Sequence, residues 1–446
     1  VNYLSYFGGS RQSAVNAIAL DAAGNVTVAG WTYATDFPTT PGAFDRSCGD
    51  DGTCVTNKWD PMSMRFTNQA TTDGFVATLS PAGDRIMYAT YVGGRDNDHV
   101  SALAVDSAGR IHVAGGTISA DFPTTAGALQ PSFAHGTGPD QSVLLDGFYA
   151  RLSAGATALQ YGTYLGSYGS DAATSLAVDA GGDAFVTGYT QSEHFPTKNA
   201  VQPTNSSWAQ YPNTLSDAWL ARFSGSDAMY STYVGGSDSD SAASVAVVDG
   251  DVYLAGHTCS PDFPGAPQSN SECKAFISEL NGASGGVSRT VVLHGAGGSD
   301  GIGGIAVDAN HVVYATGSTS GSNAFPTTAD AAQRTSGGGR DAFLAIVDMR
   351  AGGSLLYSTY FGGADDESAW PVALDGRGGA YFGGQAASTG NHSSFPSHNA
   401  HPRPAPEPPQ TYTYPPNLAS LVAYVSMRES APSSAGDIVL YARDAR

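Results

Sequence analysis

The chain has 446 residues, of which 56 are Gly and only 13% are charged, and its 40 Asp and Glu against 20 Lys and Arg give a formal net charge of −20. This charge repels phosphate backbones and anionic lipid surfaces, so we expect no nucleic-acid partner. No run of about 18 apolar residues occurs, which predicts that no segment spans a membrane. The composition is that of a soluble, turn-rich, all-β protein.

The first predicted element, Tyr3–Gly9, is an aromatic strand that ends in a Gly-Gly corner. Similar strands recur at Tyr88–Gly94, Tyr161–Gly166, Tyr230–Gly236, Val292–Gly298 and Tyr357–Gly363. Self-similarity at this scale indicates a repeat fold, whose units cannot bury their own faces and pack against their neighbours. We therefore predict one main domain rather than the roughly three that the length alone suggests.

A first strand that ends in Asp follows each corner. After a short turn comes a second strand that ends in Gly-x-Thr or a similar motif. The residues that end the first strands are Asp21, Asp106, Asp179, Asp249, Asp308 and Asp375. A Phe-Pro pair then closes each copy, at Phe37-Pro38, Phe122-Pro123, Phe195-Pro196, Phe263-Pro264, Phe325-Pro326 and Phe395-Pro396. The sequence therefore contains six repeat units.

A third strand opens in most copies with Asp, a small residue and an aromatic residue, as in Asp73-Gly74-Phe75. The other third strands open at Asp146, Asp217, Lys274, Asp341 and, in a degenerate copy, Ala419. The aromatic strand before the next corner is the fourth. Four antiparallel strands per repeat form the blade of a β-propeller, so we predict an all-β, six-bladed β-propeller.

The two ends of the chain determine how such a ring closes. Tyr3–Gly9 is a fourth-type strand that precedes any first strand, and we predict that it completes the sixth blade. The propeller then covers residues 1–429, and residues 430–446 form a linker with a surplus strand, Ile438–Arg443, or the start of a further module. Alternatively, Ile438–Arg443 supplies the outer strand of the sixth blade.

Four cysteines form two local pairs, Cys48 with Cys54 and Cys259 with Cys273, each within a loop. Neither pair has the second Cys or His pair of a zinc site, so we predict two short-range disulfides. Disulfides persist in oxidising compartments, and the chain begins at Val1 without a signal-peptide pattern. We therefore expect a mature secreted protein, extracellular or at the cell surface, whose leader has been removed, and we expect a monomer.

The repeat text resembles the bacterial SBBP-type β-propeller repeat family. Tyr230–Gly236, Ala177–Asp179, Thr187–Thr190 and Asp36–Thr40 are similar to the family's consecutive stretches, and the resemblance covers nearly the whole chain. The fourth and sixth copies depart most, because Phe263-Pro264-Gly265 and Phe395-Pro396-Ser397 replace Phe-Pro-Thr-Thr. The resemblance implies the propeller fold. It implies no catalytic motif, since the family is a scaffold of extracellular bacterial proteins.

Sequence variation is concentrated between the second and third strands. The separation from the Phe of Phe-Pro to the third strand ranges from 13 to 38 residues, whereas the first two strands are evenly spaced. These connections share one rim with the blade-to-blade corners, and loops on a rigid scaffold commonly carry binding groups. Trp59, Trp208 and Tyr211 in these loops suit stacking on sugar rings or anchoring a partner, unless they only pack the loops.

One position per repeat, the x of Gly-x-Thr or its equivalent, differs in every copy: Trp31, Gly116, Tyr189, His257, Ser318 and Gln385. A structural position tends to repeat its residue, so this variation favours an asymmetric ligand pocket near the axis; divergence without function is the alternative. We predict that ligand is bound by the larger of these side chains and by the nearby tryptophan, namely Trp31, Tyr189, His257, Gln385 and Trp370.

The corners are rich in acids that suit Ca²⁺, at Asp96 and Asp98, Asp238 and Asp240, and Asp365 and Asp366. Asp after Gly also forms turns, and no copy has the full Glu-terminated calcium loop. Calcium binding is therefore a hypothesis beside a turn-forming role.

Two functions stay open. The first is a binding or adhesion module that recognises a glycan or a cell-surface protein through its loop-rich face. The alternative is a carbohydrate-active enzyme, either a polysaccharide lyase or a glycoside hydrolase, with its site in the axial pocket of that face. No two candidate catalytic residues are fixed in mutual geometry by the sequence; the candidates are Asp98, His99, Tyr189, His257, Asp366 and Glu367.

Overall fold

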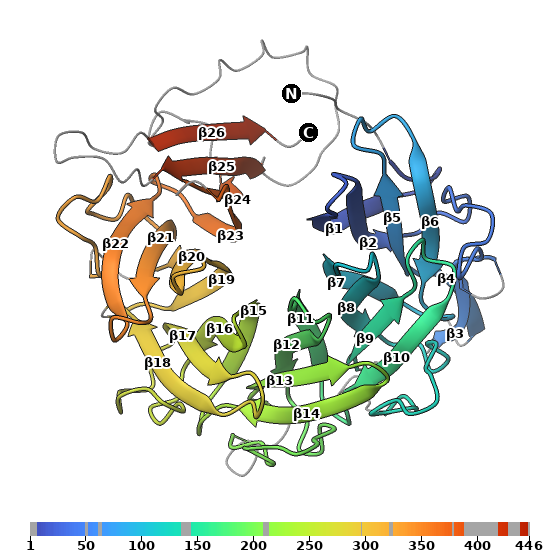
Figure 1. Cartoon of the computed structure of the whole chain (residues 1–446), viewed down its shortest axis with the longest axis horizontal. Coiled ribbons are helices and arrows are strands. Elements are labelled where there is room, and N and C mark those ends of the chain that lie inside the picture. Colours follow the sequence, from blue (N-terminus) through green and yellow to red (C-terminus); the bar gives the residue numbers. More distant parts are fainter. Residues whose placement is uncertain are drawn as a thin grey trace. The chain divides into compact units, whose positions relative to one another are not determined.

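A computed structural model describes residues 7–49, 52–60, 65–134, 144–207, 214–295, 297–320, 324–376, 379–387, 418–426 and 438–444. Within these ranges every regular element is a β-strand, and the strands form six four-stranded antiparallel sheets and one two-stranded sheet (Figure 1). No described segment is a helix long and apolar enough to cross a membrane. The all-β prediction is confirmed.

The first three four-stranded sheets belong to one compact unit, which comprises residues 1–250 and 281–286. Their strand orders are β1 (Ser13–Leu20), β2 (Val26–Thr32), β5 (Asp73–Leu79), β6 (Ile86–Val92); β7 (Asp98–Val105), β8 (Ile111–Thr117), β9 (Asp146–Leu152), β10 (Leu159–Leu165); and β11 (Asp171–Val178), β12 (Ala184–Thr190), β13 (Asp217–Ser224), β14 (Asp227–Val234). The β2–β5 connection contains a separate hairpin, β3 (Val55–Asp60) and β4 (Arg65–Ala70). β15 (Asp240–Val248) is the last strand of this unit.

The second unit comprises residues 251–280 and 287–446. It holds β16 (Asp251–Thr258), β17 (Lys274–Asn281) and β18 (Val287–Leu293), which follow β15 in the order of the fourth sheet. The fifth sheet is β19 (Asp300–Val307), β20 (Val312–Thr319), β21 (Asp341–Asp348) and β22 (Ser354–Phe361). The sixth sheet is β23 (Glu367–Leu374), β24 (Gly379–Ala387), β25 (Leu418–Ser426) and β26 (Ile438–Asp444).

The Phe-Pro pair of the repeat owes its recurrence to packing and to one hydrogen bond. The Phe ring packs on the aromatic residue that opens the third strand, with centroids 4.4 Å apart for Phe122 and Phe148 and 4.9 Å apart for Phe195 and Trp219. In three copies the backbone N–H of this Phe donates to a fourth-strand tyrosine hydroxyl: Phe37 to Tyr91 at 3.2 Å, Phe195 to Tyr233 at 2.9 Å and Phe325 to Tyr360 at 3.0 Å. The Phe rings of the five copies that the structure describes are buried, so these five second-to-third connections start from a fixed point in the core.

The sixth sheet corrects the predicted ring closure. Its fourth strand is β26, which pairs antiparallel with β25 from Ala419 opposite Asp444 to Val425 opposite Ile438. Of the predicted N-terminal strand, residues 3–6 lie outside the described residues and 7–9 are not in a strand. Each end of the chain has a segment that was considered for the outer strand of the sixth blade. The C-terminal segment is the one that pairs with β25, as the alternative assignment predicted. The domain boundary at residue 430 stays a prediction.

Both predicted disulfides are present, Cys48–Cys54 and Cys259–Cys273. Each closes a short loop within a second-to-third connection. The connection with the longest insertion, between β2 and β5, therefore carries both a disulfide and its own hairpin.

Candidate functional site

The second-to-third connections are held at their base by buried side chains that open the third strands. The carboxylate of the opening Asp accepts a hydrogen bond from a backbone N–H of the connection in four sheets. The pairs are Gly49 to Asp73 (2.7 Å), Ala134 to Asp146 (3.1 Å), Ser206 to Asp217 (2.8 Å) and Gly337 to Asp341 (3.0 Å). We call these four acids the loop-anchor acids. They tie an interior point of each of these four connections to the rigid sheet.

A second buried acid opens the next first strand and holds the corner. Its carboxylate accepts the backbone N–H of the corner residue four positions earlier, as from Gly94 to Asp98, Ser167 to Asp171, Gly236 to Asp240 and Gly363 to Glu367, at 2.7–2.8 Å. Its own backbone N–H donates to the carbonyl just before the loop-anchor acid, for example Asp171 to Leu145 at 2.7 Å. We call these the corner acids. Each lies beside the loop-anchor acid of the preceding sheet.

Burial makes the charged form of these acids costly. It raises the pKa of Asp146 to about 8, and the nearby Asp171 adds to the rise. It likewise raises the pKa of Asp217 to about 8, with Asp240 as the neighbouring charge. The pKa of Asp98 rises to about 7 although Gly94, Thr117 and Ser119 donate to it. At neutral pH the pair Asp146 and Asp171 and the pair Asp217 and Asp240 therefore each keep a proton.

Glycine at the corner is required by the carboxylates rather than by the turn. A Cβ atom on Gly93 would lie 2.5 Å from Oδ1 of Asp73 and 2.7 Å from Oδ2 of Asp98. A Cβ atom on Gly166 would lie 2.4 Å from Oδ1 of Asp146, which are distances that real Cβ atoms do not adopt. The two buried acids therefore exclude every other residue type from the corner.

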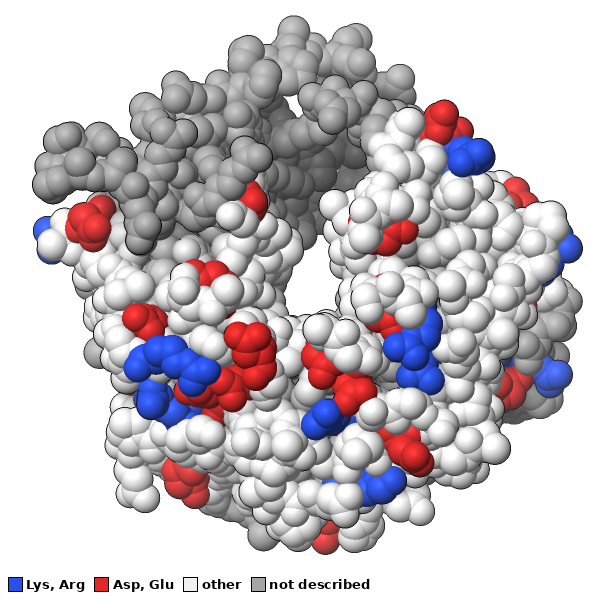
Figure 2. All heavy atoms as spheres, in the orientation of Figure 1, with Lys and Arg blue, Asp and Glu red and all other residues white. Residues whose placement is uncertain are grey.

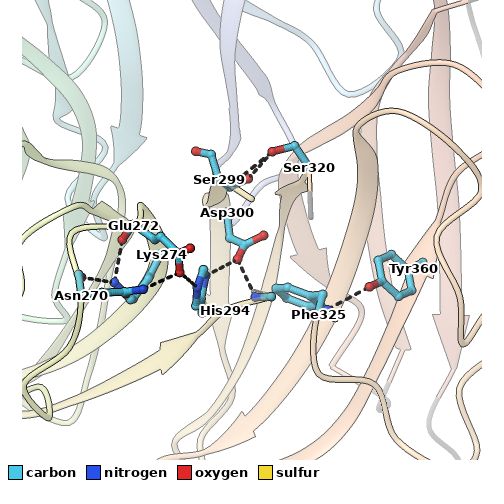
Figure 3. A network of polar contacts seen from close by, with 10 residues as sticks. Asn270, Glu272, Lys274, His294, Ser299, Asp300, Ser320, Phe325 and Tyr360 are labelled. Carbon is cyan, nitrogen blue, oxygen red and sulfur yellow. Dashed lines mark hydrogen bonds and ion pairs between the residues drawn. The ribbon is translucent and has the colours of Figure 1, made fainter. Parts of the chain in front are cut away.

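In the fourth sheet the connection and the corner are held by different side chains (Figure 3). Lys274 replaces the loop-anchor acid, and its ammonium donates to the backbone carbonyls of Asn270 (2.5 Å) and Glu272 (2.6 Å). His294 stands where the other corners have Gly, and its two ring nitrogens lie 2.9 Å from carboxylate oxygens of the corner acid Asp300 and of Glu272. The Lys274 side chain points to the loop and not to the corner, so the corner has room for the Cβ atom of His294.

The residues predicted to line the axis lie at equivalent positions of successive sheets. In the first unit, Trp31 pairs with Ala14, Gly116 with His99, and Tyr189 with Ala172, so each sheet presents one large and one small side chain at this end. Trp31, His99 and Tyr189 are all half-buried. In the second unit, His257 is half-buried and Gln385 is exposed. Burial lowers the pKa of both His99 and His257, which keeps the two imidazoles neutral at pH 7.

Of the three predicted loop aromatics, Trp59 lies in β3 opposite Phe66, and Trp208 and Tyr211 fall outside the described residues. Trp370, on β23, is 43% exposed.

The acids predicted as metal ligands play unequal parts. Asp98 and Asp240 are corner acids and fully buried, whereas Asp96 lies in the preceding bend and Asp238 is half-buried. Asp365 is half-buried, and the exposed Asp366 accepts the backbone N–H of Arg340 at 2.8 Å. The described residues contain no group of three or more His, Cys, Asp or Glu side chains that could hold a metal ion. Calcium binding stays a prediction.

Among the candidate catalytic residues, Asp98 and Glu367 are corner acids. The structure does not bring either of them to a surface, since Asp98 is 0% and Glu367 3% exposed. The sequence reasoning recognised the loop-anchor acids only as strand openers. The recurrence of Asp at that position, with Lys274 as the exception beside the exceptional His294, was the signal that could have revealed them.

A family model described as a beta-propeller repeat, SBBP, matches residues 88–123 and 160–196. The chain carries SBBP β-propeller repeats. The two matches run from a fourth strand through a corner to the Phe-Pro pair, so they contain the corner acids Asp98 and Asp171.

No curated protein sequence matches the chain. Two solved structures are similar to it: a Dos1 propeller, at 8% identity over 84% of this chain and 91% of that one with a TM-score of 0.34, and a gluconolactonase from Xanthomonas campestris, at 11% identity over 84% of both chains with a TM-score of 0.33. At these scores neither carries an argument about the SBBP-repeat chain.

The exceptional fourth corner predicts a measurable coupling. Lys274→Asp alone should destabilise the protein, because a new buried acid would face Asp300, Glu272 and the Cβ of His294. Combined with His294→Gly it recreates the ordinary SBBP corner, so the double variant should be more stable than the sum of the two single changes by about 1–2 kcal/mol. Urea denaturation of the four proteins measures this coupling. Lys274→Asp with the exposed His194→Gly serves as the additive control, and additivity at residues 274 and 294 would contradict the explanation.

The buried acid pairs predict that stability falls as pH rises. The folded-state pKa of Asp146 is about 8 against 3.8 for the unfolded chain, so the folded state binds the proton more tightly. The stabilisation is complete below about pH 4 and is lost as pH rises through about 8, at a slope of up to about 1.4 kcal/mol per pH unit. Asp146→Asn should flatten the loss between pH 5 and pH 9 in denaturant titrations, and Asp84→Asn, at an exposed acid, should not. Equal slopes in Asp146→Asn and wild type would refute this origin.

Proposed function

We propose that this chain is a secreted, non-catalytic binding or adhesion module that recognises a glycan or a cell-surface protein on the face formed by its second-to-third connections. The observation that carries the proposal is the anchoring of these connections. Their lengths vary widely, yet five of them are fixed to the sheet by a buried side chain that bonds to loop backbone. Variable loops on fixed bases are the arrangement of a binding surface. Two disulfides in these loops support secretion.

The half-buried row in the first unit supports a ligand that stacks on aromatic rings. Trp31 and Tyr189 stand at equivalent positions at the loop end of the first and third sheets, and His99 stands at the same end of the second sheet on the neighbouring strand, opposite Gly116. Trp31 lies edge-on to Tyr33, with ring centroids 5.5 Å apart, which limits the motion of its ring. Fixed aromatic faces bind sugar rings and peptide side chains at little entropic cost. Calcium bound at the corners would add to this face, and the binding experiment includes it.

We also propose that the six sheets are the blades of one closed propeller, with the first sheet covered by the sixth. The support is an apolar surface on β1, where Val15, Ile18 and Leu20 are 52%, 67% and 66% exposed. The equivalent of Val15 in β7 is Val100, which is fully buried against the first sheet. A first strand in this fold thus packs on the preceding sheet, and β1 needs one as well.

Ring closure predicts that Ile18→Asp destabilises the protein by at least about 1 kcal/mol, because the substitution would bury a charge at a sheet interface. Met229→Asp, at an exposed apolar residue of an outer strand, should change stability by less than about 0.5 kcal/mol. Denaturant unfolding of both variants measures the difference. A neutral Ile18→Asp would show that the β1 face stays open to water.

The proposed function is tested by screening polysaccharides for binding and for product release, each with and without a chelator. We expect binding without released oligosaccharides, and chelator sensitivity would identify a calcium contribution. Trp31→Ala and Tyr189→Ala should weaken binding by about tenfold or more, since a stacked aromatic ring contributes on the order of 1–2 kcal/mol. Met229→Ala is the matched control. Release of oligosaccharides would favour the carbohydrate-active enzyme over the binding module. Absence of binding to glycans and to cell surfaces would refute both proposals.

A further inference from the structure

Basic side chains on the face drawn in Figure 2 generally stand beside acidic ones. In the first unit, Arg222 on β13 illustrates the arrangement: its Nη2 lies 2.7 Å from Oδ2 of Asp183, and its guanidinium lies over the ring of Phe185. In the second unit, Arg350 pairs with Asp251 at 2.7 Å. In both cases a carboxylate of a neighbouring turn or strand end neutralises the arginine.

Arg151 on β9 lacks such a carboxylate among the described residues. It occupies the place that Arg222 has in the next sheet, since Arg151 pairs in register with His112 as Arg222 does with Phe185. Its side chain is only 6% exposed, its Nε atom is fully buried without a hydrogen-bond partner, and no described residue forms an ion pair with it. A buried guanidinium without an anion is costly, so this group requires a partner.

The position that supplies the acid to Arg222, that of Asp183, is occupied in the second sheet by another arginine, Arg110. By strand register, Arg110 precedes β8 where Asp183 precedes β12, so the acid of the third sheet is replaced by a cation in the second. Arg110 bonds through Nε to Asp106, the acid of its own turn, and its Nη2 would lie 2.3 Å from a Cβ on Gly182. Arg110 and Arg151 thus stand at the same end of β8 and β9, and the acid at that end, Asp106, bonds to Arg110 and not to Arg151.

The neighbouring histidine does not remove this excess of positive charge. Asp106 accepts from both Arg110 and Nε2 of His112, and Nδ1 of His112 accepts from the hydroxyl of Tyr149 at 2.9 Å. Burial lowers the pKa of His112 to about 4, and the charges of Arg151 and Arg110 lower it further. A neutral imidazole is consistent with a local field that is already positive. The other acid nearby, Asp183, is held by Arg222.

We propose that Arg151 and Arg110 form an anion-binding site for an oxyanion: a carboxylate, sulfate or phosphate group. Guanidinium groups match the planar, bidentate geometry of such groups. The site lies at the Ile111 and Leu152 end of β8 and β9, whereas the loop-rich face begins at the opposite end, where Thr117 pairs with Asp146. It is therefore separate from the proposed loop surface. The bound group supplies the negative charge that Asp183 supplies to Arg222.

The test uses the full chain and four probes: sulfate, phosphate, glucuronate and chloride at matched ionic strength. Calorimetric titration and thermal unfolding should show saturable binding and a raised unfolding midpoint with the oxyanions, and neither with chloride. Arg151→Gln should weaken oxyanion binding by at least about tenfold. Arg222→Gln, at the equivalent arginine that already has its acid, is the matched control and should bind as the wild type does. Binding of glucuronate alone would assign the site to acidic sugars, and equal binding of sulfate and phosphate to free oxyanions.

Arg110→Asp tests the same proposal in a variant built to fold. It recreates the Arg222 and Asp183 arrangement, so the unfolding midpoint in chloride should rise and the response to oxyanions should disappear. The proposal is overturned if the wild type shows no saturable oxyanion binding, or if Arg110→Asp keeps it.

Discussion

A carboxylate buried at the junction of two sheets is the interaction on which this structure depends. The corner acid binds the corner backbone, and the loop-anchor acid binds the connection that follows the second strand. Burial without such donors would cost several kcal/mol, so the donors and the acids must be present together. This mutual requirement links three features that are far apart in the sequence: the corner glycine, the start of the first strand and the start of the third.

The fourth corner shows which part of that requirement is essential. Lys274 reverses the polarity of the anchor, because it donates to loop carbonyls where the acids accept from loop N–H groups. The loop stays anchored although the charge has changed sign. Removal of the acid also releases the corner from glycine, and His294 then joins Asp300 to Glu272. The feature that the first five sheets share is therefore a buried polar group that reaches loop backbone, and its chemistry can change when the corner changes with it.

The repeat text predicted the sheets well, since alternating strands and Phe-Pro packing are local properties that one copy displays in full. The outer strand of the sixth sheet could not be assigned in this way, because both Tyr3–Gly9 and Ile438–Arg443 were candidates for it. The pairing with β25 decides between them. Two of the corner acids, Asp98 and Asp240, were predicted as calcium ligands beside a turn-forming role, because residues two apart in an extended segment share a side. Asp96 lies in a bend and Asp98 opens a strand, so these two residues do not belong to one extended segment. Burial, which separates these roles, is not a property of the local sequence.

Because the backbone repeats from sheet to sheet, a difference between equivalent side chains reflects the side chains and their surroundings rather than the fold. Arg222 and Arg151 occupy the same place in successive sheets, and the backbone around them is paired in the same register. The shared backbone therefore does not explain why Arg222 has an acid as its partner and Arg151 has none among the residues that the structure describes. A packing error would be expected to create a cavity or an exposed charge, yet Arg151 is buried and its strand is complete. The neighbours that differ are His112 in place of Phe185 and Arg110 in place of Asp183, and the second change removes the negative charge that the proposed oxyanion would supply.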